Sequence, residues 1–169
     1  MFSTGPGGAC VHVWDKHGRV IYEDAVAGVG RPVGVSMDAN DDIYMMIAGV
    51  GTMNGKLHWN PITCTYFKTK PRSKFLATDS VLPLPASSRP PREPEIRGAD
   101  FAGDIWTEGA YWSQGGVGWD GKRMKCHCAS QSRPALDYYA RSFLPEVDHY
   151  SVLVLDTNGN EILRLGRYG

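Results

Sequence analysis

The sequence predicts an all-β fold built from repeated antiparallel hairpins, and two copies of one hairpin are the first indication. Residues 11–21 and 152–162 each contain an extended run that ends in Asp, two turn residues, a Gly and a second extended run. An Asp at the start of such a turn hydrogen-bonds its own backbone, and the Gly accepts the positive φ that a tight reversal needs. The two Asp residues, Asp15 and Asp156, lie 141 residues apart, which is three steps of 47.

This spacing favours one kind of repeat architecture. A step of 47 residues falls within the period of roughly 40–50 residues that is typical of a β-propeller blade. The length of the chain then corresponds to about three four-stranded antiparallel blades, and a closed ring needs at least about four. We therefore expect a partial β-propeller, an open arc whose exposed blade edges are prone to self-association.

A single domain of four consecutive segments is expected. Residues 30–80 carry alternating apolar positions before an Asp/Asn turn, with outer strands expected at 62–70 and 74–78. Five prolines between residues 82 and 95 remove ladder donors and favour an extended loop, with a proline-motif ligand as the alternative. The segments are the outer hairpin of an incomplete blade (1–29), a blade (30–80), a proline-rich insertion (81–103) and a blade with long loops (104–169).

Composition excludes several functions. Eighteen basic residues balance eighteen acidic ones, so no long-range field recruits nucleic acid or an anionic membrane surface. The apolar runs are much shorter than the ~20 residues that span a bilayer, so no membrane partner is expected. The N-terminal residues lack the basic and apolar regions of a secretory signal. Either the protein is intracellular or its true beginning is missing, and a secreted or periplasmic location is the expectation for a full-length protein.

A longer pattern carries a family resemblance. Pro32-x-Gly34-Val-x-x-Asp38-x-x-x-Asp42-Ile-Tyr44, followed by outer Asp-x-x-Gly hairpins, resembles the NHL-repeat class of β-propellers. Residues 136–146, which lead into the last hairpin, are similar to segments of large NHL-type proteins of environmental bacteria. The sequence departs from the usual pattern at Asp42, where Gly-Asn is more common, and in its proline-rich insertion.

The resemblance implies a fold more than an activity. NHL-type propellers are commonly six-bladed, so this chain is expected to be a fragment of a longer protein. The expected function is a non-catalytic binding or protein-interaction scaffold, with a protein or small-molecule partner at the channel mouth. The alternative is part of a metal-dependent propeller enzyme, lyase-like or lactonase-like, whose site needs the missing blades. No cofactor and no catalytic residue are predicted, because no nucleophile elbow, Ser/His/Asp order or metalloprotease helix is visible.

Two groups of residues are candidates for ligand contact. Trp106, Glu108 and Trp112 suggest an aromatic-lined pocket with one carboxylate, although aromatic residues at alternating positions are more often sheet core. Arg133, Asp137 and Arg141, together with Glu146, alternate in sign. These four residues are expected to form one ion-pair network that pins the connection to the blade, and the alternative is recognition of a carboxylate or phosphate by the two arginines.

Cys126, His127 and Cys128 form the one element with soft-metal chemistry. Residues two apart on a strand face the same way, so the two sulfurs could project together. Two sulfurs and one nitrogen leave the four-ligand shell of zinc unfilled, and the other cysteines belong to other blades. We therefore predict no metal here and two buried thiols or a local disulfide, with a soft-metal or redox site as the alternative.

Overall fold

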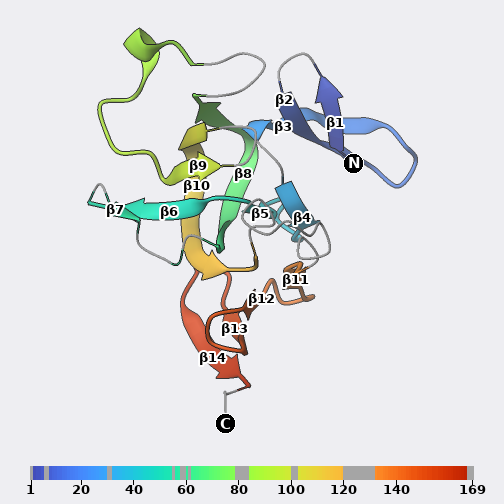
Figure 1. The fold of residues 1–169 in the computed structure, drawn as a ribbon. Helices are drawn as coiled ribbons and strands as arrows, with labels where there is room; N and C mark the ends of the chain where they lie inside the picture. The colour runs from blue at the N-terminus through green and yellow to red at the C-terminus, as the bar shows by residue number, and fades with distance from the viewer. Residues whose placement is uncertain are drawn as a thin grey trace.

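The computed structural model is all-β. It describes residues 2–5, 8–29, 32–54, 56–57, 60, 62–78, 84–99, 103–119 and 132–166, and within these ranges it contains fourteen strands, one 3-10 turn at Ala86–Ser88 and no α-helix (Figure 1). None of these residues belongs to a helix that could cross a membrane. The strands are β1 (Phe2–Gly5), β2 (Gly8–Trp14), β3 (Val20–Val29), β4 (Pro32–Met37), β5 (Ile43–Ile47), β6 (Val50–Met53), β7 (Lys56–Leu57), β8 (Cys64–Ala77), β9 (Ile96–Ala99), β10 (Gly103–Val117), β11 (Ala135–Leu136), β12 (Ser142–Glu146), β13 (Ser151–Leu155) and β14 (Glu161–Leu165).

The centre of the molecule is the antiparallel series β4-β5-β8-β10. Strand β5 pairs with both β4 and β8, and β8 pairs along its length with β10. We refer to these four strands as the central sheet. Strands β9, β6 and β7 extend it beyond β10, and the first three strands of the chain join it through β8.

The two outer strands predicted at 62–70 and 74–78 are a single strand in the structure. One strand of 14 residues, β8, runs through both ranges, and Arg72 accommodates the irregularity between them with a φ of 67°. The strand stays continuous because β10, which has 15 residues, pairs with it on both sides of the irregularity. The fourth strand of the central sheet therefore comes from beyond the proline-rich insertion.

The last four strands, β11 to β14, form a separate antiparallel sheet in sequence order, which we call the C-terminal sheet. It contains the second predicted hairpin, at 152–162, as β13 and β14. The predicted last blade, 104–169, has a different start: β10 belongs to the central sheet, and the C-terminal sheet begins at Ala135. In Figure 1 this sheet lies beside β4 and the end of β10.

The predicted hairpin around Asp15 is present as β2 and β3. Strand β1 pairs with β2, and β3 runs parallel to β8 over two residue pairs, which makes the first sheet a mixed one. Residues 84–95 of the proline-rich segment form an extended connection with a 3-10 turn, which agrees with the predicted loop. The predicted bounds, 81–103, were too wide, because Ile96–Ala99 form strand β9, which pairs with β10 and β6. The segment returns to the sheet beside β10, where Arg92 donates to the carbonyl of Thr107.

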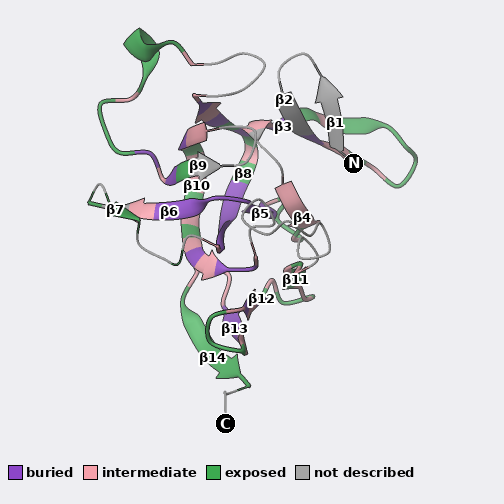
Figure 2. Cartoon of the chain, viewed as in Figure 1, coloured by how far each residue is buried: buried purple, intermediate pink, exposed green. Residues whose placement is uncertain are grey.

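Two hydrophobic cores lie on opposite faces of β5. Ile43, Met45 and Ile47 face a core shared with the β2–β3 hairpin. Tyr44 and Met46 face a second core, which they share with the leucines of the C-terminal sheet. Strand β5 is therefore buried on both sides, whereas β14 is exposed along its length (Figure 2). The second core is where charged residues also become buried, and it contains the candidate site.

Candidate functional site

Four turns in the described part of the chain have the same hydrogen-bonding geometry. In each, the Asp carboxylate accepts the backbone N–H groups of the second and fourth residues after it, at 2.8–3.1 Å. The third residue after each Asp has a positive φ. The predicted turn chemistry is confirmed at both ends of the chain, and the geometry recurs between them. The four turns begin at Asp15, Asp38, Asp137 and Asp156.

One turn differs from the other three in the residue that follows at the fourth position. Arg19, Arg141 and Asn160 each donate a side-chain N–H to the second oxygen of their own turn's Asp, at 2.7–3.0 Å. Asp42 occupies this position after Asp38, and a carboxylate has no proton to donate. The second oxygen of Asp38 is therefore available to groups from outside the turn.

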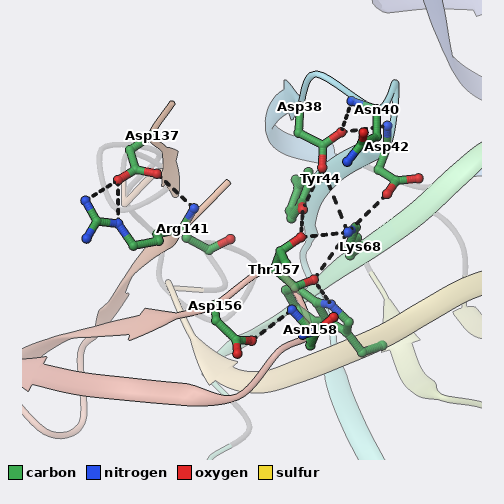
Figure 3. Close-up of polar contacts among 12 residues, drawn as sticks. Asp38, Asn40, Asp42, Tyr44, Lys68, Asp137, Arg141, Asp156, Thr157 and Asn158 are labelled. Atoms are coloured by element: carbon green, nitrogen blue, oxygen red, sulfur yellow. Dashed lines mark hydrogen bonds and ion pairs between the residues drawn. The ribbon is translucent and has the colours of Figure 1, made fainter. Parts of the chain in front are cut away.

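Those groups come from β5 and β8. The hydroxyl of Tyr44 donates to Asp38 Oδ2 at 3.0 Å, and Lys68 Nζ lies 3.8 Å from the same oxygen and 3.0 Å from Asp42 Oδ2 (Figure 3). All three charged side chains are largely buried, with exposed fractions of 9% for Lys68, 5% for Asp38 and 14% for Asp42. These side chains meet because of the strand register. Tyr44 of β5 pairs directly with Lys68 of β8, so both side chains lie on the face of the second core.

The remaining partners come from the other sheet. Lys68 Nζ donates to the hydroxyl of Thr157 at 2.9 Å and to its carbonyl oxygen at 3.2 Å. Thr157 lies in the turn between β13 and β14, so this ammonium group joins the central sheet to the C-terminal sheet. The Tyr44 and Thr157 hydroxyls lie 3.2 Å apart. Because Tyr44 gives its proton to Asp38, Thr157 supplies the proton of this contact, and all donors of the group have acceptors.

Trp112 completes the contact. It pairs with Lys68 on the other side of β8, and its indole N–H donates to the carbonyl of Thr157 at 3.1 Å. The turn lies directly against the indole, because a Cβ atom added to Gly159 would lie 2.9 Å from Trp112 Cδ2. We call Asp38, Asp42, Tyr44, Lys68, Trp112 and Thr157 the inter-sheet lock.

The pKa values of Lys68 and Tyr44 are both displaced away from neutrality. Burial acts to lower the pKa of Lys68, but Tyr44 and Asp42 outweigh it and hold this pKa above its ordinary value of 10.5. Burial raises the pKa of Tyr44 above 10.0. Lys68 therefore stays a cation and Tyr44 a neutral donor at neutral pH. Neither group is poised for general acid–base catalysis, which needs a pKa near the working pH. The geometry favours a structural role.

The predicted aromatic group is divided between two locations. Trp106 is buried and donates its indole N–H to the carbonyl of Arg92 at 2.8 Å, in the proline-rich segment. Glu108 is exposed and pairs across the strand with Lys74. Trp112 belongs to the inter-sheet lock. The two tryptophans therefore hold different segments against β10, and the structure does not direct the three side chains to one shared partner.

The predicted network of four alternating charges is replaced by two groups. Arg141 pairs with Asp137 inside their own turn, with two N···O distances of 2.7 Å. Glu146 is buried and accepts from Arg164 and Ser151, both at 2.8 Å. The prediction of one network was wrong because Glu146 pairs with Arg164, whose side chain reaches it from β14 across the intervening strand β13. Arg133 is exposed.

The cysteine element cannot be placed, because Cys126, His127 and Cys128 lie outside the described residues. Within the described ranges, no three His, Cys, Asp or Glu side chains are grouped so as to hold a metal ion. Sequence reasoning missed Lys68 and Thr157 altogether. The available signal was Asp42, which departs from the usual turn, but nothing in the local sequence connects this residue with a buried cation.

Comparisons with known proteins give no relative for this chain. No protein-family model, curated protein or solved structure matches it.

Proposed function

We propose that this chain is part of a longer NHL-type β-propeller and acts as a non-catalytic binding scaffold. The support is the way in which two antiparallel series of strands follow each other. The series β4-β5-β8-β10, which is the centre of a ten-stranded sheet, and the four-stranded sheet β11 to β14 each place their strands side by side in the order of the sequence. Gly34 of β4 faces Pro134 at the entry to β11, and Tyr66 of β8 contacts Ser142 of β12 at 3.3 Å. Face-to-face stacking with first strand beside first strand is how neighbouring propeller blades pack.

The inter-sheet lock is the observation that carries the scaffold proposal. It is a buried group of charges whose donors all have acceptors within the chain, at the contact between the two sheets. Such a group fixes the relative position of two sheets and leaves no acid, base or nucleophile available for a substrate. A rigid arc of this kind presents its turns for binding while the sheets stay fixed.

The contact surface that fits this function is the turn between β11 and β12. Tyr138 and Tyr139 are 93% and 72% exposed, and their rings meet edge to face at 5.5 Å between centroids. The guanidinium of Arg141 lies 5.3 Å from the ring centre of Tyr139, and Asp137 holds that guanidinium in place. Exposed tyrosines are typical binding anchors, because a large ring brings much contact area. In a propeller this turn, next to the first strand of a blade, lies at a mouth of the channel.

Binding to arrays of peptides and oligosaccharides tests the proposal. A Tyr138→Ala/Tyr139→Ala variant is compared with Tyr150→Ala, which removes an exposed tyrosine from the opposite end of the same sheet. We expect wild-type protein and Tyr150→Ala to retain the same ligand and the double variant to lose at least tenfold in affinity. Equal binding by the double variant would contradict the proposed surface. Stoichiometric bound metal together with lactone hydrolysis would favour the enzyme alternative.

A further inference from the structure

The turn between β13 and β14 contains an Asn-Gly pair, Asn158 and Gly159, which can react with itself in water. Once the amide nitrogen of the Gly has given its proton to hydroxide, it attacks Cγ of the Asn side chain and forms a C–N bond. The side-chain nitrogen takes a proton from water and leaves as ammonia, so the product is a cyclic imide. Water then opens one of the imide carbonyls and gives Asp or isoaspartate. A Gly favours the attack because it has no Cβ to obstruct the nitrogen.

The backbone of this turn, and not the Asn side chain, limits the reaction. Asn158 is exposed, so water reaches its amide. The Gly159 N–H donates to the carbonyl of Asp156 at 3.1 Å. The Asn158 N–H donates to the carboxylate of Asp156 at 2.8 Å (Figure 3). The attacking nitrogen must give up its hydrogen bond and turn toward the side chain, so the reaction needs a turn that has opened.

The inter-sheet lock keeps this turn closed. Thr157, the residue before Asn158, accepts from Lys68 through its hydroxyl and its carbonyl oxygen, and the same carbonyl accepts from the indole of Trp112. Gly159 lies against that indole. Opening the turn breaks these buried contacts between two sheets, which the turn of an isolated hairpin does not have. The rate of a reaction that needs a local opening falls with the population of the open state.

We propose that Asn158 is a site of spontaneous deamidation whose rate is set by the inter-sheet lock, and that its isoaspartyl product prevents the lock from closing again. In isoaspartate the backbone runs through the side-chain methylene, so the turn becomes longer. The free α-carboxylate also adds a negative charge to a turn that already holds the carboxylate of Asp156. The lock then opens once and does not reform. The inference rests on the lock and does not depend on the proposed scaffold function.

A second Asn-Gly pair in the chain gives an internal reference. Asn54 is exposed, lies between β6 and β7 and has no part in the lock, and Gly55 follows it in the sequence. Both pairs meet the same solvent and the same pH in one sample. Global unfolding exposes both pairs to reaction, whereas opening of the inter-sheet lock exposes Asn158 alone. The ratio of the two rates therefore separates the lock from the stability of the whole fold.

Mass spectrometry of tryptic peptides measures both rates during incubation at mildly alkaline pH, for the folded chain and for the chain unfolded in guanidinium chloride. We expect Asn158 of the folded wild type to react roughly a hundredfold more slowly than in the unfolded chain. Lys68→Met should raise this folded rate about tenfold or more and leave the rate at Asn54 unchanged. Lys70→Met, at an exposed position of β8, should change neither rate. If Lys68→Met does not fold, Trp112→Phe, which removes the indole N–H, gives the same comparison.

The effect of the product is tested against a matched charge. In an Asn54→Gln background, the isoaspartyl chain is formed from the unfolded protein, separated by chromatography and refolded. Asn158→Asp in the same background adds the same negative charge on an ordinary backbone. We expect the isoaspartyl chain to unfold at a lower urea concentration than Asn158→Asp, because only the isoaspartyl turn is too long to close the lock.

Three results would overturn the proposal. The first is a folded wild type in which Asn158 reacts as fast as in the unfolded chain. The second is a Lys68→Met variant in which the rate at Asn158 is unchanged, or rises only in step with the rate at Asn54. The third is an isoaspartyl chain that is as stable as Asn158→Asp.

Discussion

Lys68 is the residue on which the buried charges depend. Replacing it with Met keeps the length of the side chain but leaves Asp38 and Asp42 buried without a cation. Breaking a buried ion pair from one side is strongly destabilising, so we expect Lys68→Met to lower the free energy of unfolding by about 2–4 kcal/mol. Urea unfolding measures the change. Lys70→Met, the same substitution at an exposed position of β8, should cost less than about 0.5 kcal/mol. Equal effects at the two positions would contradict the lock.

Glu146 gives the fold a defined response to acid. Burial acts to raise the pKa of this carboxyl, but the hydrogen bonds from Arg164 and Ser151 outweigh burial and hold the pKa below its ordinary value of 4.5. Because the folded state binds the proton less tightly than the unfolded state does, the ion pair stabilises the fold fully above the ordinary carboxyl pKa. The stabilisation is lost as the pH falls through the lowered folded pKa.

The expected result is a difference between two acid profiles. Urea unfolding at pH 7, 5, 4 and 3 should show a smaller acid-induced loss of stability for Glu146→Gln than for the wild type. Glu161→Gln removes a half-exposed carboxylate that contacts the same arginine, and its profile should stay close to the wild-type one. Parallel profiles for wild type and Glu146→Gln would show that Glu146 is not held in this ion pair.

The sequence indicated the residue types at the site better than it indicated their roles. Trp112, Asp137 and Arg141 were predicted as ligand contacts, and each has a partner within the chain. Lys68 gave no signal, because one Lys in an alternating strand usually faces solvent. Its burial depends on a turn 89 residues further along the chain, and no local pattern encodes that contact.

At the scale of the turns, alanine substitutions at two glycines distinguish the cost of backbone strain from the cost of a packing clash. Gly18 and Gly159 occupy the same position of equivalent turns, with φ values of 81° and 85°. A Cβ atom at Gly18 meets nothing within 4 Å, whereas one at Gly159 meets the ring of Trp112. Gly18→Ala should therefore show only the cost of a positive φ, about 1 kcal/mol. Gly159→Ala should cost about 1 kcal/mol more, because the turn must move off the indole.

Chemical unfolding and tryptophan fluorescence together check this pair of variants. The emission of Trp112 should shift in Gly159→Ala, since the turn that covers the indole moves, and should stay unchanged in Gly18→Ala. Equal destabilisation with unchanged emission in both variants would mean that the turn does not pack on Trp112.

The secondary-structure elements were predicted correctly where the sequence has a recognisable turn motif. They were predicted wrongly where two strands pair across a long connection. The hairpins at Asp15 and Asp156 carry Gly at the residue with positive φ, and both were predicted. The turn at Asp137 was missed because Ala140 occupies that position with a φ of 58°. Strand β10 was assigned to the last blade because no residue in the sequence shows that it pairs with β8 across the proline-rich insertion.

At the scale of the whole molecule, two sheets with separate strand orders are joined by the buried polar groups of the inter-sheet lock and by single hydrogen bonds, such as that from the Gly118 N–H to the carbonyl of Pro145 at 2.7 Å. The apolar rows of the second core bring the sheets together without fixing their register, since burial of apolar area is non-directional. The hydrogen bonds of the inter-sheet lock are directional, and they fix which residues meet. The lock therefore fixes the position of the two sheets relative to each other at this contact, which the proposed scaffold function requires.

A double-mutant cycle across the two sheets tests this claim most directly. Lys68→Met removes the donor on the central sheet, and Thr157→Val removes the acceptor hydroxyl on the C-terminal sheet while keeping the shape of the side chain. Groups in direct contact typically couple by 0.5–3 kcal/mol, so the account predicts a coupling energy of about 1 kcal/mol from urea unfolding of the four proteins. Two effects that add within about 0.3 kcal/mol would show that the Lys68 ammonium and the Thr157 hydroxyl do not meet, which would contradict the inter-sheet lock.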